Sequence, residues 1–497
     1  MGVKSYFSGW FSKYIVYKNS FWKKKPILYQ ERIFNSLLKK SKKTKFGEDH
    51  GFVEIKNYSD WKKRVPVKDY EGLSKYINRI INGEENVLWP KNPIYFCKTS
   101  GTTSGVKYIP ITTDSMPYHL KAARDAILSY INETGNTSIV NGKMIFLQGS
   151  PKLSKTGKIL TGRLSGIVAH HIPFYLQKNR LPSFETNLIP DWDKKVDAIV
   201  KETINEKMTL ISGIPPWVQM YFEKVISISG KNIGSTFPFF KLFIYGGVNF
   251  EPYKKTFESL IGRNLDGVEL YPSSEGFIAY QDSQKEPGML LCVNHGIFYE
   301  FIVSDDFFNE NPERICLKDV ELGVNYVIIL NTNAGLFGYN LGDTVKFVNL
   351  NPYKIVVTGR IKHFTSAFGE HVIAEEVEKS LNLTINNLPC EVNEFHVSPV
   401  INPKIGLPYH EWLIEFEKEP ENIGEFEKML DENLQVLNSY YKDLIVGKVL
   451  TRLKIVRIQK FGFRKYMKSI GKLGGQNKTP RLANDRKIAD LLKNINN

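Results

Sequence analysis

The chain has 497 residues, which gives room for about three average domains or for one large and one small domain. Hydrophobic residues make up 42% of it, enough for a substantial core. The net charge of +15 is compatible with nucleic acid or a membrane surface, but no nucleic-acid-binding module is recognisable, so we expect no nucleic-acid partner. The four cysteines lack the spacing of a disulfide framework or a zinc site, which favours a reducing, cytoplasmic setting.

No apolar stretch approaches the roughly 20 residues that a membrane span needs, and we recognise no targeting segment. Positive charge is concentrated at the two ends of the chain. Residues 1–45 carry twelve Lys or Arg and one Glu, and residues 447–497 carry fourteen Lys or Arg and two Asp. The central part is therefore acidic on balance.

The basic N-terminal segment is expected to be helical, because Phe7, Trp10, Phe11 and Tyr14 recur at i, i+3, i+4 and i+7. Such an apolar stripe is typical of a helix docked on its own domain. The alternative is a helix that makes peripheral contact with a membrane surface, since lysines occupy its other faces.

Further along the chain, short apolar runs typical of strands alternate with helical patterns, which predicts an α/β fold. The expected strands include residues 144–147, 209–214, 242–245, 268–271 and 326–330. The expected helices include residues 73–82, 115–132, 193–204 and 217–228. The Gly- and Ser-rich segment 150–192 is expected to be a loop on the substrate side. Its adjacent His170 and His171 have no carboxylate partner at ligand spacing, so no metal site is expected there.

The most informative stretch is KTSGTTSGVKYIP, residues 98–110. Glycines and small hydroxyl residues leave consecutive backbone N–H groups free to form a concave anion site, and a lysine adds a point charge suited to phosphate. It is not a Walker A loop, because no Gly-Lys-Ser/Thr follows. A plain surface turn is the alternative on these residues alone. The candidate phosphate-binding residues are Thr99, Ser100, Gly101, Thr102, Thr103, Ser104, Gly105 and Lys107.

Three further motifs follow expected strands. IYGGVN holds Gly246 and Gly247, which allow close backbone approach by a planar ligand. LYPSSEG, residues 270–276, places an aromatic ring, two hydroxyls and a carboxylate at a strand end, where ligands bind in open α/β sheets. FGYNLGD, residues 337–343, ends in an acid after a glycine. Each motif taken singly is also compatible with an ordinary turn.

The loop at 98–110 resembles the phosphate-binding loop of the adenylate-forming superfamily, which reads roughly T-S-G-T-T/S-G-x-P-K. The variant found here, together with VPVKDYE at 65–71 and Y-x-S-S-E at 271–275, resembles the auxin-responsive-promoter family of acyl acid amido synthetases. The segment HFTSAFGEHVIAEEVEKSL at 363–381 resembles the bacterial branch of that family. One departure is Asn340, which stands where the family usually has Arg.

The resemblance implies roles for individual residues. Tyr271 and the Gly246-Gly247 pair would lie against adenine, and Ser274 would bind phosphate or the substrate carboxylate. Glu275 would hold Mg²⁺, for which one carboxylate with phosphate oxygens is sufficient. Asp343 would accept the ribose hydroxyls. The later residues with implied catalytic roles are Arg360, which would touch ribose or phosphate, and Lys478, which would enter the site during adenylation.

The implied architecture is a large N-terminal adenylate-forming domain with β-sheets and packed helices, residues 1–358, and a small mobile α+β domain, residues 363–497. Residues 359–362 would form the hinge, with Lys362 as the pivot. The implied enzyme is a ligase that uses ATP and Mg²⁺, joins a small carboxylic acid to AMP, and passes the acyl group to an amine such as an amino acid. The alternatives are an acyl-CoA ligase with coenzyme A as acceptor, and a non-catalytic nucleotide-binding protein at a membrane surface. The acid, the amine and the oligomeric state stay open.

Overall fold

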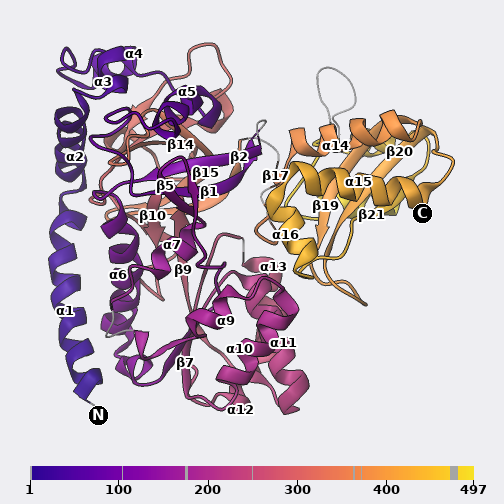
Figure 1. Ribbon diagram of the computed structural model, residues 1–497, viewed down its shortest axis with the longest axis horizontal. Helices are drawn as coiled ribbons and strands as arrows, with labels where there is room; N and C mark the ends of the chain where they lie inside the picture. Colours follow the sequence, from indigo (N-terminus) through magenta and orange to yellow (C-terminus); the bar gives the residue numbers. More distant parts are fainter. Residues whose placement is uncertain are drawn as a thin grey trace.

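The computed structural model describes residues 3–102, 105–173, 177–248, 250–361, 364–365, 367–370, 372–470 and 479–496. A large body built from the N-terminal three quarters of the chain adjoins a smaller C-terminal domain along the long axis of the molecule (Figure 1). The predicted mixed α/β fold with a large and a small domain is therefore confirmed. The exact boundaries proposed from the sequence remain a prediction.

Twelve strands of the described chain form one sheet that has a parallel half and an antiparallel half. The parallel half is, in spatial order, β6 (Arg180–Leu181), β3 (Lys143–Phe146), β7 (Met208–Ser212), β8 (Leu242–Gly246) and β9 (Asp266–Ser273). The antiparallel half continues with β10 (Gly276–Tyr280), β11 (Met289–Leu291), β16 (Tyr353–Arg360), β15 (Tyr339–Leu350), β14 (Asn325–Thr332), β12 (Ile297–Val303) and β13 (Ile315–Cys316). Each of the strands expected from the sequence is present, within two residues at either end.

The expected helices are also present. The helices of the large domain that follow the N-terminal region include α5 (Tyr70–Ile81), α6 (Met116–Thr134), α10 (Trp192–Thr203), α11 (Pro215–Ser229), α12 (Ile233–Thr236) and α13 (Glu251–Ile261). Pro215 and Pro216 begin α11 and do not interrupt it, because the first helical positions have no intrahelical partner for an N–H group.

The prediction that residues 150–192 form a loop is wrong. This segment contributes β4 (Ser154–Thr156), β5 (Ile159–Gly162), α7 (Leu164–Ala169) and α9 (Phe184–Leu188). Strand β5 pairs in parallel with β1 (Tyr95–Thr102), which also pairs with β2 (Gly105–Ile111), and a small sheet of order β2-β1-β5-β4 results. The pairing to β1 supplies backbone partners that local sequence could not reveal.

The small domain is an α+β unit around a sheet of order β19-β20-β21, in which β19 and β20 are antiparallel and β20 and β21 are parallel. Its buried residues, such as Trp412 and Leu430, belong to the same hydrophobic cluster as residues of α11 and α13 in the large domain. The elements are β17 (Phe364–Thr365), β18 (Val372–Ile373), α14 (Ala374–Asn387), β19 (Glu391–Val400), β20 (Tyr409–Lys418), α15 (Ile423–Leu437), α16 (Ser439–Val446), β21 (Lys454–Ile458), α17 (Gly462–Ser469) and α18 (Lys487–Asn496).

The N-terminal region is helical, as predicted, and comprises α1 (Val3–Lys24), α2 (Pro26–Ser41), α3 (Lys45–Asp49) and α4 (Tyr58–Arg64). Helix α1 does pack on the large domain, but the expectation that its aromatic stripe faces that domain is wrong. Phe7, Trp10 and Tyr14 are exposed, and α1 instead buries Ser5, Ser12, Ile15, Asn19 and Trp22. In Figure 1, α1 and α2 run along the edge of the large domain that lies farthest from the small domain.

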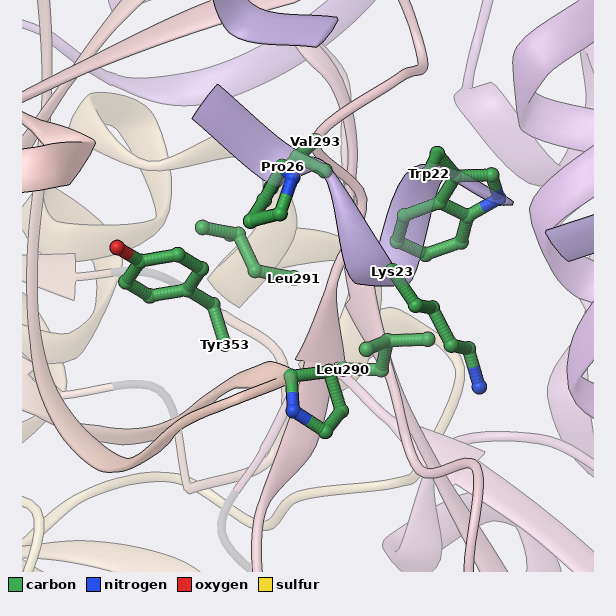
Figure 2. Close-up of a pocket in the computed structure, with 8 residues that line it drawn as sticks. Trp22, Lys23, Pro26, Leu290, Leu291, Val293 and Tyr353 are labelled. Carbon is green, nitrogen blue, oxygen red and sulfur yellow. The ribbon is translucent and has the colours of Figure 1, made fainter. Parts of the chain in front are cut away.

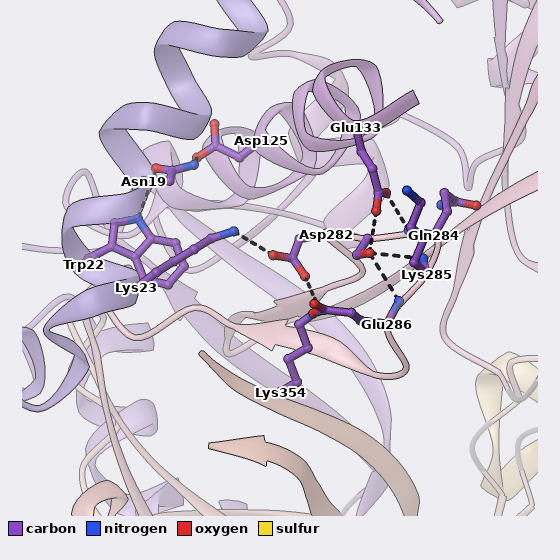
Figure 3. Close-up of polar contacts among 11 residues, drawn as sticks. Asn19, Trp22, Lys23, Asp125, Glu133, Asp282, Gln284, Lys285, Glu286 and Lys354 are labelled. Carbon is purple, nitrogen blue, oxygen red and sulfur yellow. Dashed lines mark hydrogen bonds and ion pairs between the residues drawn. The ribbon is translucent and has the colours of Figure 1, made fainter. Parts of the chain in front are cut away.

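Polar contacts fix the C-terminal half of α1 to α6 (Figure 3). Asn19 donates from Nδ2 to Oδ2 of the fully buried Asp125 at 3.0 Å, and Trp22 donates from Nε1 to Oδ1 of Asn19 at 3.0 Å. Asp125 also forms ion pairs with Lys121 at 2.9 Å and Arg124 at 2.7 Å. Since the buried carboxylate is paired on several sides, it holds α1 in one rotational setting.

A second set of charges ties the end of α1 to the large sheet, also drawn in Figure 3. Asp282 lies 2.6 Å from Nζ of Lys23 and 2.9 Å from Nζ of Lys354, and Lys354 also lies 2.6 Å from Glu286. Burial by itself would raise the pKa of Asp282, but the attraction of Lys23 and Lys354 is larger and holds the pKa below its ordinary value. The ionised form is therefore the one that the fold stabilises.

Replacing Asp282 by Asn should destabilise the fold, because the buried Lys354 would keep only Glu286 as partner. Removing one member of a buried ion pair typically costs about 3 kcal/mol. Because the folded pKa of Asp282 is depressed, its stabilisation is complete above the unfolded value of about 3.9 and is lost as the pH falls through the folded pKa. Urea unfolding should show a constant difference between wild type and variant near neutral pH that shrinks in acid.

A matched control is Glu48→Gln, which removes the exposed ion pair between Lys45 and Glu48 and should change the unfolding free energy by less than about 1 kcal/mol. Equal effects of the two substitutions at pH 7 would show that Asp282 makes no special contribution.

Candidate active site

The predicted phosphate-binding stretch forms the end of the β1–β2 hairpin. Thr99 lies opposite Lys107 and Thr102 lies opposite Gly105, with a register shift between Thr99 and Thr102. A register shift of this kind leaves part of the strand without regular ladder bonds. Two of the expected phosphate-binding residues, Thr103 and Ser104, lie outside the described residues.

Ser274 and Glu275 form the tight connection between β9 and β10, at the point where the sheet changes from parallel to antiparallel. Oγ of Ser273 accepts the N–H of Glu275 at 3.2 Å and donates to the carbonyl of Gly276 at 3.1 Å, which fixes the turn. The Cys97 thiol lies 3.1 Å from Oγ of Ser274 and so joins the turn to β1. The hairpin and the carboxylate turn are thereby held next to each other.

The Glu275 carboxylate is buried, with 7% of its surface exposed. Its Oε1 accepts a hydrogen bond of 3.1 Å from the hydroxyl of Tyr339, which begins β15. Burial, followed by the charge of Glu275, raises the pKa of Tyr339 well above its ordinary value, so this hydroxyl stays a donor. Tyr339 belongs to the motif FGYNLGD, but the sequence did not indicate a role for this residue.

Asp343 receives one donor from β9 and one from the adjacent strand β16. The hydroxyl of Tyr271 donates to Oδ2 at 2.5 Å, and Nε of Arg360 donates to Oδ1. Burial by itself would lower the pKa of Arg360. The negative charge of Asp343 and its hydrogen bond to Arg360 have the larger effect, so the pKa of Arg360 is raised. Asp343 and Arg360 also face each other in the register of β15 and β16. Each carboxylate oxygen retains capacity for a further donor.

Lys107 completes this group of charges. Its pKa is lowered, mainly by burial and also by repulsion from Arg360, while Glu275 and Asp343 act in the opposite direction. A partly desolvated ammonium placed among two carboxylates and a guanidinium is suited to bind a strongly anionic group such as phosphate. The predicted residues Lys107, Ser274, Glu275, Asp343 and Arg360 thus gather in one place.

The Gly246-Gly247 pair lies at the end of β8, as predicted. Gly246 pairs with Leu270, and a Cβ at Gly246 would meet the Leu270 carbonyl oxygen at 2.2 Å, so only glycine fits beside β9. Gly247 has a φ of +81°, which also favours glycine. The two glycines therefore bring the backbone close to the strand that carries Tyr271.

Asn340, the departure from the family pattern, has a local role. Its Oδ1 accepts the N–H of Gly342 at 2.8 Å. An Asn side chain that bonds the backbone two residues on stabilises a turn. Asn340 thus shapes the backbone just before Asp343.

The small domain reaches the hairpin through α16. The hydroxyl of Tyr440 donates to the carbonyl of Lys98 in β1 at 2.9 Å, and burial raises the pKa of Tyr440 to about 12. Arg163 forms an ion pair with Asp443 and lies 4.1 Å from the centre of the Tyr440 ring. Sequence analysis missed these three residues, because only the tertiary fold brings the segments together.

Lys478 and Lys362 lie outside the described residues, so their predicted roles stay predictions. Gly359 and Arg360 are the last residues of β16. His170 and His171 make separate contacts: ring nitrogens lie 2.8 Å from the carbonyl of Pro151 and 3.1 Å from the hydroxyl of Tyr95. They do not converge on a common site.

Within the described part of the chain, no group of three or more His, Cys, Asp or Glu is arranged to hold a metal ion. Glu275 nonetheless fits a magnesium site of the kind predicted, because Mg²⁺ is commonly bound by one or two carboxylates with phosphate oxygens and water. Its buried side chain lies near Lys107.

Figure 2 shows a small pocket at the junction of α1 and α2. It is too narrow to admit a water molecule and therefore cannot hold a small-molecule ligand. None of the candidate site residues lines it. Its walls are formed by Trp22, Lys23, Pro26, Leu290, Leu291, Val293, Pro352 and Tyr353.

Comparison with known protein families gives three consistent matches. The profile of the GH3 family N-terminal domain matches residues 20–191, that of the GH3 family central domain matches residues 290–360, and that of the GH3 family C-terminal domain matches residues 373–487. The matched segments follow the order of the chain and together cover most of it.

Individual relatives agree. The jasmonoyl–L-amino acid synthetase JAR4 of Nicotiana attenuata is 22% identical over 384 residues, which span 64% of this chain and 66% of that protein, slightly under two thirds. The indole-3-acetic acid-amido synthetase GH3.3 of Arabidopsis thaliana is 21% identical over 93% of this chain and 90% of its own.

Solved structures share the fold. The GH3.15 acyl acid amido synthetase has a TM-score of 0.61 at 15% identity, over 96% of this chain and 95% of its own. A 2-hydroxyisobutyryl-CoA ligase, in complex with 2-HIB-AMP and CoA in the thioesterification state, has a TM-score of 0.58 at 13% identity. The match covers 95% of this chain and 91% of that ligase.

The fold is shared with the solved GH3.15 structure. Together the three domain matches show that the chain belongs to the GH3 family.

Proposed function

We propose that this protein activates a small carboxylic acid with ATP and transfers the acyl group to an amine, in particular an amino acid. In the first step a carboxylate oxygen attacks the α-phosphorus of ATP, and the bond to pyrophosphate breaks to give acyl-AMP. In the second step the amine nitrogen attacks the acyl carbon, AMP leaves, and the nitrogen loses a proton. The observation that carries this proposal is the convergence of Lys107, Glu275 and the Asp343–Arg360 pair beside the β1–β2 hairpin.

The chain's own residues supply binding and electrostatic stabilisation, and no side chain needs to act as a nucleophile. Asp343 would accept the ribose hydroxyls while Tyr271 and Arg360 keep its carboxylate oriented. Lys107 and the backbone of the hairpin would bind phosphate oxygens, where charge develops in the transition state. Mg²⁺ held by Glu275 would neutralise phosphate charge. Lys478 would add an ammonium near the α-phosphate in the first step only.

The activity test is ATP–pyrophosphate exchange over a panel of carboxylic acids. With an accepted acid, AMP release should then be measured with amino acids and, separately, with coenzyme A. We expect amide formation with at least one amino acid. AMP release with coenzyme A alone would favour the acyl-CoA ligase alternative, and the absence of exchange with every acid, ATP and Mg²⁺ being present, would contradict the proposal.

Replacing Asp343 by Ala should weaken AMP binding at least about tenfold, because it removes two hydrogen bonds to a charged group worth about 1.5–3 kcal/mol each. Calorimetric titration of the variant with AMP measures the loss. Asp305→Ala, at an exposed acid, is the control and should bind AMP like the wild type. Unchanged affinity in Asp343→Ala would refute the ribose assignment.

Replacing Glu275 by Gln keeps the shape of the side chain and removes its charge. The Mg²⁺ concentration needed for half-maximal exchange should rise about tenfold or more, since a carboxylate ligand is replaced by a neutral one. Tyr339→Phe retains the carboxylate and removes only its hydrogen bond, so its Mg²⁺ curve should shift less. Superimposable Mg²⁺ curves for wild type and Glu275→Gln would rule out Glu275 as a ligand.

Lys478→Ala should slow acyl-AMP formation by about 10²–10³, the usual cost of removing one preorganised donor to a developing charge. Amide formation from supplied acyl-AMP should change little, since the lysine would leave with the small domain before this step. Lys468→Ala, at an exposed lysine of α17, serves as the control. Equal losses in both half-reactions would disprove the alternating role of Lys478.

A further inference from the structure

Helix α1 presents an aromatic surface to the outside of the molecule, far from the candidate active site. The exposed fractions are 65% for Trp10, 62% for Phe7 and 47% for Tyr14. The aromatic residues recur at helical spacing, so they form one stripe along the helix, about 22 Å long at 1.5 Å per residue. We call this the aromatic stripe, and its six most exposed members are Tyr6, Phe7, Trp10, Tyr14, Tyr17 and Phe21.

The opposite face of α1 is the one buried, and it carries the polar residues Ser5, Ser12 and Asn19 beside Ile15 and Trp22. Ser5 donates to the carbonyl of Thr137 at 3.2 Å, and Asn19 donates to the buried Asp125 at 3.0 Å. Near Ser5, a Cβ at Gly9 would lie only 3.3 Å from the Thr137 side chain. Rotating α1 to bury the aromatic stripe would break these bonds and leave Asp125 with fewer donors. The outward orientation is therefore built into the fold.

The charge around the aromatic stripe has one sign. The first 30 residues contain no Asp or Glu. Lys4, Lys13, Lys18 and Lys24 are exposed, and none has an ion-pair partner among the residues that the structure describes. On a helical projection, Lys13 and Lys24 flank the stripe on one side, and Lys4 and Lys18 flank it on the other. Lys23, on the buried side, is paired with Asp282.

We propose that the aromatic stripe binds the surface of an anionic lipid bilayer, with α1 lying in the plane of the interface. Trp and Tyr favour the headgroup boundary, where the ring is partly buried and a polar edge meets water, and Phe adds apolar area that the interface buries. Flanking lysines attract anionic headgroups. A stripe of aliphatic residues with charges of both signs would instead favour a helical protein partner. No helix of the described residues is long and apolar enough to cross a membrane.

The test is sedimentation of the full-length protein with vesicles of phosphatidylcholine alone, or of phosphatidylcholine with phosphatidylserine. Wild type should bind the anionic vesicles more strongly than the neutral ones, and added salt should weaken the binding. The variant Phe7→Ser/Trp10→Ser/Tyr14→Ser should partition at least about tenfold less. Because the three side chains are exposed, melting temperature and ATP–pyrophosphate exchange in solution should stay unchanged.

Two further variants separate the contributions. Phe308→Ser removes an aromatic ring that is 73% exposed elsewhere on the large domain, and it should bind vesicles like the wild type. Lys13→Glu/Lys18→Glu keeps the aromatic stripe, and it should lose the preference for anionic vesicles.

Absence of vesicle binding by the wild type, or equal partitioning of the wild type and the triple serine variant, would overturn the proposal. Sedimentation velocity without lipid provides a second check. A dimer that the triple variant abolishes, together with no vesicle binding, would identify the aromatic stripe as a contact between two copies of this chain. Because these measurements need no catalysis, their failure is distinct from failure of the proposed reaction.

Discussion

The ion pair between Asp343 and Arg360 joins the adjacent strands β15 and β16 and sets the charge of the candidate active site. A carboxylate on a side chain that is only 11% exposed would be costly without a partner, and both the Arg360 guanidinium and the Tyr271 hydroxyl stabilise it. The hydroxyl comes from β9, at the boundary between the parallel and antiparallel halves of the sheet. The order and register of the strands bring Tyr271 and Arg360 to Asp343. The charges of the candidate active site therefore depend on this ion pair.

The sequence predicted the sheet and its helices well, because apolar runs such as residues 326–330 consist of residues that favour strands. In the structure this run is buried within β14. The sequence also singled out Lys107, Glu275, Asp343 and Arg360, because they lie in short motifs next to strand ends. The structure brings these residues near one another, and their roles stay predictions. What it missed depends on tertiary contacts. Segment 150–192 is rich in Gly and Ser, yet β5 is stabilised by pairing with β1, whose paired residues lie 65 positions earlier (Tyr95 with Leu160).

The aromatic stripe shows a second limit of prediction from sequence. Periodicity identified a helix and an apolar face correctly, but it could not decide which face meets the domain. The orientation of α1 is determined by Asp125 and Asp282, because Asp125 accepts a hydrogen bond from Asn19 and Asp282 pairs with Lys23. The polar residues on the inner face of α1 were the informative ones, and a hydrophobicity pattern gives them no weight.

The contact between the two domains has a consequence for sequence change. The hydroxyl of Tyr440 donates to the main-chain oxygen of Lys98, and the side chain of Lys98 takes no part in this hydrogen bond. Any residue that keeps β1 extended can therefore occupy position 98 without weakening this bond. The exposed side chain there can change the charge next to the phosphate-binding hairpin while the docking of α16 stays the same. At position 440, by contrast, a hydroxyl on a ring of that length is required, so the two partners of one hydrogen bond face unequal constraints on their identity.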